Sequence, residues 1–396
     1  MMKALNDNAH PLESLLKQHC PNGVEFKELG EVCETLPKGT LKTSQLTANG
    51  YPVINSGRDL YGYYSKFNNE SNAFTIAARG EYAGFVNFMD SKFWAGGLCY
   101  PYRSNDENKL LTKFIYYHLK TNESNIMDSL VARGSIPAIN KKDIDKKLKI
   151  PIPPLEIQSK IVEILDTFTE LEAELEAELE ARLKQYHYYR NKLLSHDELE
   201  NRTAKSRNDS DPATLVPYVR LGEACEILDN LRKPITKSKR TQGIYPYYGA
   251  NGIQDYVNEY IFDGDFLLMG EDGSVINKDN SPVLNWVSGK FWVNNHAHIL
   301  KEKSNTTNLR FVFFYLQTCD VSSIVRGVPP KINQQNLKTI QIPLPPLAVQ
   351  NEIVELLDKF DTLTNDLTSG IPAEIEARKK QYEYYRERLL SFIAKD

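Results

Sequence analysis

Apolar residues recur at every third or fourth position through residues 157–194, and glutamates fill most of the remaining positions. This spacing lines up the apolar side chains along one face of a helix, so it predicts a long helix that needs a partner on that face. The prolines of residues 151–154 exclude helix there, because proline lacks the backbone N–H and restricts its predecessor. We therefore expect a helix from Ile157 to Leu194, about 57 Å long at 1.5 Å per residue.

A second stretch, residues 353–389, has the same pattern with an interruption at residues 369–372. Glycine followed two residues later by proline predicts that the helix stops or kinks at this point. Two helices with equal apolar faces are most simply satisfied by packing against each other in antiparallel fashion. The alternative is that each helix lies on its own domain.

Both helical stretches belong to a duplication that covers most of the chain. Residues 150–166 (IPIPPLEIQSKIVEILD) return 192 residues later as residues 342–358 (IPLPPLAVQNEIVELLD), whereas residues 35–130 and 227–322 share only fragments. A repeat this long is no solenoid, and it predicts one frame that holds two different surfaces. The other repeated segments are residues 29–34 with 221–226 and residues 184–195 with 380–391.

The divergent blocks combine strand, turn and helix patterns. Alternation at Tyr51–Ile54 and Phe291–Val293 predicts short strands, and Asn49 and Asn251 each precede a turn glycine. Helical patterns at 110–120 and 309–317 are expected to pack on the sheets. The predicted fold class is α+β: two mixed α/β domains joined by a pair of long antiparallel helices, with intramolecular pseudo-two-fold symmetry. The expected parts are residues 1–155 (first domain), 156–195 (central spacer helix), 196–217 (polar, flexible linker), 218–347 (second domain) and 348–396 (C-terminal spacer helix).

Composition narrows the class of protein. With 396 residues, 41% of them hydrophobic, the chain can bury at least two cores. It has no stretch of about 18 apolar residues and no N-terminal cleavage pattern, so we expect neither a membrane span nor export. The five cysteines lack a CxxC spacing and are expected to be reduced thiols of a cytoplasmic protein.

The net charge of −4 is unevenly distributed. Lys and Arg outnumber Asp and Glu by three in residues 1–150 and again in residues 201–346, whereas both helical ends are acidic. A mild positive charge on the divergent blocks suits contact with phosphates, and the acidic helices should face solvent or protein.

Two related loops, residues 133–140 (RGSIPAIN) and 326–333 (RGVPPKIN), precede short predicted helices. Arginine, glycine backbone and amide side chains suit phosphates and base edges, so we expect Arg133 and Arg326 to contact DNA, with a structural ion pair as the alternative. Glycine-rich turns at 78–84 and 269–275 lie either at DNA-approaching tips or in ordinary hairpins. The candidate DNA-binding residues are Arg79, Tyr82, Lys92, Arg133, Ser135, Asn140, Lys141, Asn251, Asp272, Ser274, Lys290, Arg326, Lys331, Asn333 and Gln334.

Signals for catalysis are missing from the sequence. His296 and His298 are spaced to share one strand face, but no cysteine or carboxylate pattern supports a metal site, and core or loop roles are expected. The chain has no adenine methyltransferase motif, P-loop, GxSxG or HExxH. It is therefore expected to recognise rather than transform, without a cofactor of its own.

These features resemble the specificity subunit of type I restriction-modification systems. The resemblance rests on the IPxPPL element, the helix beginning IVEILD or IVELLD and the KQYxYYRxxLLS tail, each present twice, and it spans the whole chain. It implies two target recognition domains that each read one half of a split, non-palindromic site on double-stranded DNA. It also implies a helical spacer that docks two modification subunits carrying S-adenosylmethionine, joined by restriction subunits that use ATP and Mg.

The repeated helix ends are the candidate docking surface, with packing inside the helical pair as the alternative. ELEA occurs three times from Glu170, and a change in repeat number would alter the gap between half-sites in steps of about 6 Å; a solvated acidic face is the alternative. Two other classes stay open: a methyltransferase or nuclease with unrecognised catalytic residues, and a coiled-coil adaptor that does not bind DNA. The docking candidates are Tyr186, Tyr189, Arg190, Tyr382, Tyr385 and Arg386.

Overall fold

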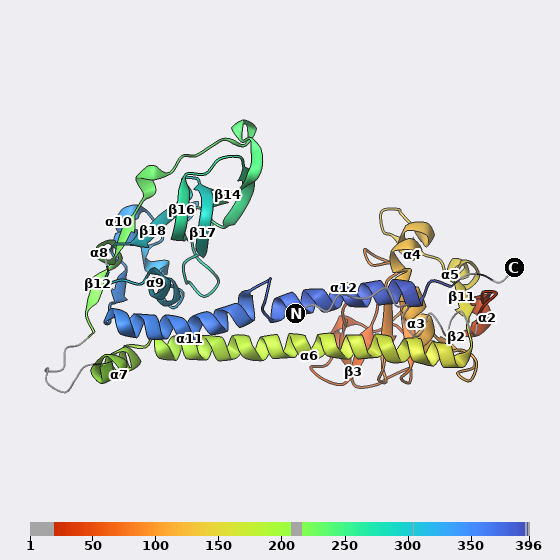
Figure 1. Ribbon diagram of the computed structural model, residues 1–396. Helices are drawn as coiled ribbons and strands as arrows, with labels where there is room; N and C mark the ends of the chain where they lie inside the picture. The colour runs from red at the N-terminus through yellow and green to blue at the C-terminus, as the bar shows by residue number, and fades with distance from the viewer. Residues whose placement is uncertain (1–19, 207–215, 304, 393, 395–396) are drawn as a thin grey trace. The chain divides into compact units, whose positions relative to one another are not determined.

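The computed structural model describes residues 20–206, 216–303, 305–392 and 394. The chain forms two compact units, unit 1 from Met1–Glu176 with Glu374–Asp396 and unit 2 from Ala177–Ala373. Helix α6 (Leu155–Leu193) continues through the boundary between them, so each unit holds one mixed domain and part of the long helices (Figure 1).

The long helices begin and end where the prolines and glycine predict. The carbonyl of Pro154 accepts the first helical hydrogen bonds of α6, which starts two residues earlier than expected. Pro346 does the same for α11 (Leu347–Asn365). The predicted interruption separates α11 from α12 (Ile371–Leu389), and at Gly370 a Cβ would lie 2.5 Å from the carbonyl oxygen of Thr362. Glycine is therefore required at this break.

The apolar face of each long helix has two partners along its length. Near the start of α6, Ile157, Ile161 and Leu165 are fully buried in the core of their own domain. Further along, Phe168 stacks on Tyr385 of α12 with ring centroids 5.5 Å apart. Both expectations, packing on the domain and packing on the second helix, are therefore met, in successive segments.

The same helix pairing recurs in both units. In unit 1, Lys379 of α12 lies 3.2 Å from both Glu172 and Glu176 of α6. Because Tyr385 lies beside Phe168 and Lys379 beside these later residues, α6 and α12 are antiparallel. In unit 2, Tyr189 of α6 stacks on Phe360 of α11, again at 5.5 Å. Phe360 and Tyr189 are the repeat equivalents of Phe168 and Tyr385.

A buried glutamine in the first turn of α6 fastens the domain of unit 1 to the helix. Gln158 accepts a hydrogen bond from the N–H of Leu111 at 2.8 Å. Its amide donates to the carbonyls of Lys109 and Pro153 at 2.9 and 2.8 Å. Three backbone groups outside the helix are thus satisfied by one side chain.

Unit 2 repeats this attachment. Gln350, also fully buried, accepts from the N–H of Asn308 at 2.8 Å and donates to the carbonyls of Thr306 and Pro345 at 2.9 and 2.7 Å. An aspartate two turns further along α6 or α11 adds an ion pair. We call Gln158 with Asp166, and Gln350 with Asp358, the helix clamp of each unit.

The aspartates of the helix clamp bind the helix that covers each sheet. Asp166 accepts from Lys113 at 2.8 Å and from Tyr117 at 2.6 Å, and Asp358 accepts from Arg310 at 2.7 Å. The repeated IPxPPL and IVExLD segments contain or adjoin the residues that make these contacts, so both copies keep the same attachment. The contacts join each mixed domain to the long helices.

In unit 1 the strands form small antiparallel sheets. The orders are β2-β8-β5-β6, β4-β3-β7 with β3 and β7 parallel, and the pairs β1-β11 and β9-β10. The elements are β1 (Glu25–Glu28), α2 (Leu29–Val32), β2 (Cys33–Thr35), η1 (Thr43–Gln45), β3 (Tyr51–Ile54), β4 (Gly62–Tyr64), β5 (Ala73–Ala77), β6 (Val86–Met89), β7 (Trp94–Ala95), β8 (Cys99–Ser104), α3 (Thr112–Thr121), α4 (Glu123–Leu130), β9 (Val131–Ala132), β10 (Ala138–Ile139), α5 (Lys141–Lys147) and β11 (Lys149–Ile152).

In unit 2 the main strands join into one six-stranded sheet, β13-β18-β16-β17-β14-β15, and β12 pairs with β19. The ten-residue strand β17 contacts both β16 and β14, whereas in unit 1 the corresponding stretch is divided into β6 and β7. The elements are β12 (Tyr218–Arg220), α8 (Leu221–Ala224), β13 (Cys225–Ile227), η2 (Asp229–Leu231), η3 (Lys237–Lys239), β14 (Gln242–Gly249), β15 (Gly252–Val257), β16 (Phe262–Gly270), β17 (Leu284–Val293), β18 (Ala297–Glu302), α9 (Leu309–Leu316), η4 (Ser322–Ile324), α10 (Gln334–Lys338) and β19 (Gln341–Pro343).

The stretch after α6 differs from the expected flexible linker. Residues 196–206 form helix α7 (His196–Ser206), with Leu199 and Thr203 buried. Arg202 of α7 pairs with Glu352 of α11 at 2.5 Å. Residues 196–206 are therefore a helix that contacts α11 and not an irregular linker, and residues 207–215 lie outside the described residues. All five cysteines are free thiols, and Cys33, Cys99 and Cys225 are buried. Within the described ranges, no helix is long and apolar enough to cross a membrane.

Candidate nucleic-acid interface

The two loop types singled out in the sequence pair with each other in unit 1. The N–H of Gly80 donates to the carbonyl of Pro137 at 2.8 Å, and the N–H of Ile139 donates to the carbonyl of Ala78 at 2.9 Å. Ile139 is buried beneath this pairing, and Asn140 caps the following helix α5. The glycine-rich turn and the RG loop therefore form one surface.

Unit 2 repeats the same backbone pairing with different side chains. The N–H of Gly273 donates to the carbonyl of Pro330 at 2.9 Å, and the N–H of Ile332 donates to the carbonyl of Glu271 at 2.8 Å. Asn333 caps α10 in the same way that the equivalent asparagine caps α5. We call residues 78–80 with 137–139, and residues 271–273 with 330–332, the recognition platform of each unit.

Glycine is needed at one position of each platform. Gly80 and Gly273 have φ angles of +100° and +78°, which side-chain-bearing residues rarely adopt. Their neighbours Arg79 and Asp272 occupy equivalent positions and bridge to Ala138 and to a lysine, Lys331, on the opposite strand. The platform thus keeps its backbone while the chemistry of its side chains changes.

The platform of unit 1 is flanked by arginines. Arg79 is exposed. Arg133 pairs with Asp128 at 2.6 Å, but its side chain is 75% exposed, so this ion pair contributes little to stability and leaves the guanidinium available to a phosphate. Ser135 is exposed beside Ile136, which is 56% exposed.

The platform of unit 2 carries both signs of charge. Asp272 pairs with His296, and Lys331 lies 3.1 Å from Glu271. Arg326 donates from Nη1 to the carbonyls of Ser323 and Val325 at 2.7 and 2.8 Å, so it shapes its own loop. The guanidinium of Arg326 thus contacts backbone carbonyls, whereas the ion pair expected as the alternative to DNA contact is formed by Arg133.

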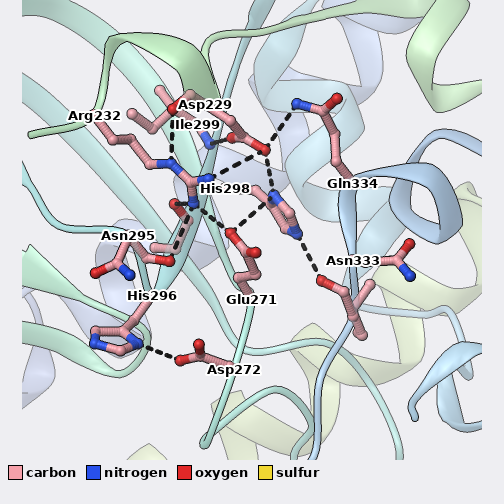
Figure 2. Close-up of polar contacts among 12 residues, drawn as sticks. Asp229, Arg232, Glu271, Asp272, Asn295, His296, His298, Ile299, Asn333 and Gln334 are labelled. Carbon is pink, nitrogen blue, oxygen red and sulfur yellow. Dashed lines mark hydrogen bonds and ion pairs between the residues drawn. The ribbon is translucent and has the colours of Figure 1, made fainter.

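A buried polar network lies beneath the platform of unit 2 (Figure 2). Its centre is His298, which is fully buried on β18 with Nδ1 2.7 Å from Asp229 and Nε2 2.8 Å from the carbonyl of Ile332. Arg232 donates to Glu271 and lies 3.8 Å from Asp229. The expected core and loop roles of the two histidines are therefore confirmed, with His298 in the core.

Electrostatics within this network favour ionised Asp229. Burial raises the pKa of its carboxyl, but the hydrogen bond from His298, the charges of His298 and Arg232 and the contact with Gln334 outweigh burial and lower that pKa overall. Asp229, Glu271 and His298 each offer one ligand atom within 4.8 Å of one another, a spacing that suits a metal ion. Arg232 already supplies the positive charge at this place, so the geometry favours a salt-bridge network.

The other predicted DNA-binding residues have assorted partners. Gln334 donates to Asp229 at 3.0 Å and so belongs to the buried network. Tyr82 is 38% exposed in the turn that contains the unit 1 platform, and Ser274 is exposed directly after the unit 2 platform. Away from the platform residues, Lys92 pairs with Glu70 at 3.2 Å, Lys141 with Asp145 at 2.6 Å, Lys290 lies over the ring of Tyr260 at 4.6 Å, and Asn251 is exposed between β14 and β15.

The predicted docking residues mostly serve packing within each unit. Tyr186 is 3% exposed and Arg190 is 9% exposed, and both contact Gln317. Tyr382 packs on Phe168, and Arg386 lies 5.4 Å from the ring of Tyr382. Tyr189 and Tyr385 are the stacking residues described above. The packing alternative therefore accounts for the contacts of these six side chains.

Sequence reasoning missed residues that the structure makes prominent. The basic run of residues 232–240 supplies Arg232 to the buried network, and Lys237 and Lys239 are exposed. Its density of Lys and Arg was a usable signal. Tyr188 and Tyr384, at 60% and 53% exposure, are the most exposed tyrosines of the repeated YxYYR segments, and the sequence pattern does not distinguish them from their neighbours.

Comparisons with known proteins identify the family. The family model of the type I restriction modification DNA specificity domain matches residues 21–185 and 216–377. The chain belongs to this family. It is 31% identical to the specificity subunit of the EcoR124I and EcoR124II type I restriction enzymes of Escherichia coli over 407 residues, covering 93% of this chain and 94% of that one. A type I restriction enzyme specificity subunit of Haemophilus influenzae is 44% identical over 181 residues, a match to 44% of this chain and 46% of the relative.

A solved structure has the same fold. The S subunit of a type I restriction-modification system from M. genitalium aligns with a TM-score of 0.67 at 21% identity, over 94% of this chain and 98% of that one. With two matched specificity domains, this chain is a specificity subunit with two target recognition domains, a DNA-recognition component without catalysis of its own. The alternatives of an unrecognised enzyme and of a coiled-coil adaptor are not supported.

Proposed function

We propose that this specificity subunit reads a bipartite, non-palindromic site on double-stranded DNA, one half through the recognition platform of each unit. The observation that carries the proposal is the recurrence of one backbone pairing under unlike side chains. The same backbone arrangement presents side chains at equivalent positions in both units. The donors and acceptors of those side chains then determine which base edges each unit can bind.

The two platforms differ in the donors and acceptors that they offer. Arg79 and Arg133 in unit 1 are donors suited to phosphate and to the acceptor edge of guanine. Unit 2 offers the carboxylate of Asp272, suited to a cytosine amino group, next to Lys331. Two unlike half-sites follow from this difference.

Methylation profiling of a host genome that carries this subunit tests the proposal. Arg79→Ala should relax or change the methylated motif in one half only, and Lys331→Ala in the other half only. Lys205→Ala, an exposed lysine of α7, is the matched control and should leave the motif intact. Changes in both halves from either single substitution would contradict the assignment of one half-site to each platform.

We further propose that the long helices dock two modification subunits, to which S-adenosylmethionine binds, and that restriction subunits with ATP and Mg join this complex in the cytoplasm. The exposed pair Tyr188 and Tyr384 supports this proposal, because repeat-equivalent tyrosines at 60% and 53% exposure offer the same aromatic group twice. The proposed docking role of Tyr186, Tyr189, Arg190, Tyr382, Tyr385 and Arg386 is then indirect, through the helix packing that presents this pair.

A further inference from the structure

His298 faces a hydrogen-bond acceptor at each of its ring nitrogens. Nδ1 is 2.7 Å from Oδ2 of Asp229, and Nε2 is 2.8 Å from the carbonyl oxygen of Ile332 (Figure 2). A backbone carbonyl only accepts, so Nε2 must carry a proton. The state of Nδ1 then depends on whether the carboxyl of Asp229 is ionised.

Three other N–H donors surround the carboxylate of Asp229. The N–H of Ile299 donates to Oδ1 at 3.1 Å, Gln334 donates to Oδ2 at 3.0 Å, and the guanidinium of Arg232 lies 3.8 Å from Oδ2. An ionised carboxylate accepts from all three of these donors and from Nδ1 of His298, whereas a protonated carboxyl could direct its proton only to Nδ1. With these donors around it, the side chain of Asp229 is best satisfied as a carboxylate, which makes Nδ1 of His298 the donor between them.

An imidazolium at this position also balances the buried charges. The side chains of Asp229, Glu271, Arg232 and His298 are only 6%, 12%, 14% and 0% exposed. Two carboxylates, one guanidinium and one imidazolium sum to zero, as burial of charge demands. Lys331, whose side chain is 47% exposed, is then not required to neutralise Glu271.

The network acts directly on the recognition platform of unit 2. Ile332 is a platform residue, and Glu271 begins the opposite platform segment. In unit 1 the position that corresponds to His298 is held by Tyr100, since β8 pairs with β5 at Ile76 as β18 pairs with β16 at Met269. The device thus belongs to the second target recognition domain.

We propose that His298 is a positioning residue of the second target recognition domain: as an imidazolium it ties the Ile332 carbonyl to Asp229, fixes the platform segment 330–332, and leaves Lys331 able to contact a DNA phosphate. This inference rests on the proposed function of the platform. It assigns a role in reading one half-site to a residue that never touches DNA.

The protonation state is tested without DNA. The full chain is labelled with ¹⁵N-histidine, and the ring signals of His298 are assigned by their absence in His298→Gln. At pH 7 both ring nitrogens should show the ¹⁵N shifts and attached protons of an imidazolium. A neutral tautomer at this pH would overturn the inference.

Two substitutions then separate positioning from charge. Asp229→Asn supplies an amide donor for an unprotonated Nδ1, so His298 becomes neutral while Nε2 still donates to Ile332. A glutamine side chain cannot donate to Asp229 and to the carbonyl of Ile332 at the same time. His298→Gln should therefore lose one of these two hydrogen bonds. The ring signals should change to those of a neutral tautomer in Asp229→Asn.

Binding is measured on duplexes that carry the site defined by methylation profiling, each with a mismatched base pair in one half. His298→Gln should reduce discrimination by about tenfold in the half assigned through Lys331, which corresponds to about one buried hydrogen bond, and leave the other half unchanged. Lys205→Ala, the exposed control on α7, should stay within about threefold of the unsubstituted chain. Equal loss in both halves, or no loss, would overturn the inference. Failure of the unsubstituted chain to discriminate in either half would instead refute the proposed function.

Discussion

His118 shows how strongly one buried side chain can depend on its surroundings. It is 9% exposed in α3, its Nε2 lies 3.2 Å from the carbonyl of Lys149, and its Nδ1 is buried without a hydrogen-bond partner. Burial lowers the pKa of His118 to about 4, although the backbone hydrogen bond opposes that shift. The folded protein therefore holds this ring neutral.

A pH dependence of stability follows from His118. Below pH 6.5 the unfolded chain takes up a proton that the folded chain refuses until about pH 4, so the free energy of unfolding should fall across this window, by about 3 kcal/mol in total. His118→Phe should abolish this part of the loss. Denaturant unfolding of both chains between pH 7 and pH 4 measures it, and parallel curves would contradict the prediction.

At the residue scale the sequence located the RG loops but not the segments with which they pair. The RG loops were recognisable because Arg, Gly, Pro and Asn recur in order. Their pairing with the glycine-rich turns was not, because the segments ARG and EDG share only glycine and Gly80 lies 57 residues before Pro137. Asp229 gave no signal, since its partner His298 lies 69 residues away.

At the scale of elements, the helix clamp explains how a divergent domain is held on a repeated helix. Gln158 and Gln350 satisfy backbone groups whose side chains are free to vary, so the attachment does not constrain the sequence of the domain. Hydrogen bonds to the backbone of the domain persist when its side chains change. Apolar packing alone would require the side chains of the domain and of the helix to change together.

Loss of the helix clamp should destabilise one unit at a time. Gln158→Leu leaves one buried and two partly buried backbone groups without this partner, at an expected cost of about 3 kcal/mol of unfolding free energy. Ser159→Leu changes the exposed neighbour on the same helix and is the matched control. Hydrogen exchange should report faster exchange at Leu111 only in the first variant; equal protection in both would show that the clamp is dispensable.

The docking surface can be tested on the helices themselves. Tyr188→Ser and Tyr384→Ser should each weaken binding of one modification subunit, and the double variant should weaken both. Native mass spectrometry of the complex gives the stoichiometry. Tyr256→Ser removes a tyrosine of similar exposure on β15 as a control. Retention of both subunits by the double variant would place docking elsewhere.

Elements with strong local signals were predictable and those held by distant partners were not. The start of α6 and the break before α12 follow from proline and glycine, and were located within a few residues. Helix α7 was missed because its sequence is polar, and its contact with α11 joins Arg202 to a residue 150 positions away. The continuity of β17 depends on pairing with β14 and β16, which sequence alone does not reveal.

At the scale of the whole molecule, the duplication gives one chain two similar units, as a dimer would have, but with different sequences. Equal contacts in both units, such as Phe168 with Tyr385 and Phe360 with Tyr189, keep the frame the same while the platforms differ. A chain of this kind can recognise an asymmetric site, which two identical subunits related by symmetry could not.

The continuous helix α6 should set the permitted gap between the half-sites. Deleting one ELEA unit, Glu174–Ala177, shortens α6 by about 6 Å, compared with 3.4 Å per base-pair step, so the tolerated gap should change by about one or two base pairs. Glu174→Gln alters the same exposed segment without changing its length and should not alter the gap. Methylation profiling gives the gap directly, and an unchanged gap after deletion would refute the role of α6 as spacer.

The fold class followed from the sequence because duplication doubles every signal: two apolar helix faces, two proline elements and two variable blocks. The identity of the bases read does not follow, because in the proposed mode of recognition it depends on a few exposed side chains, such as Arg79 and Lys331, on an irregular backbone.

The helix clamp has one more consequence. Each domain is attached to its helix by one glutamine and one aspartate of that helix, and the sequences around these residues are nearly the same in both halves of the chain. Any domain that makes the same contacts with the glutamine and the aspartate should therefore be transferable to either helix. New DNA specificities could then be assembled by exchanging whole domains, without redesigning a surface.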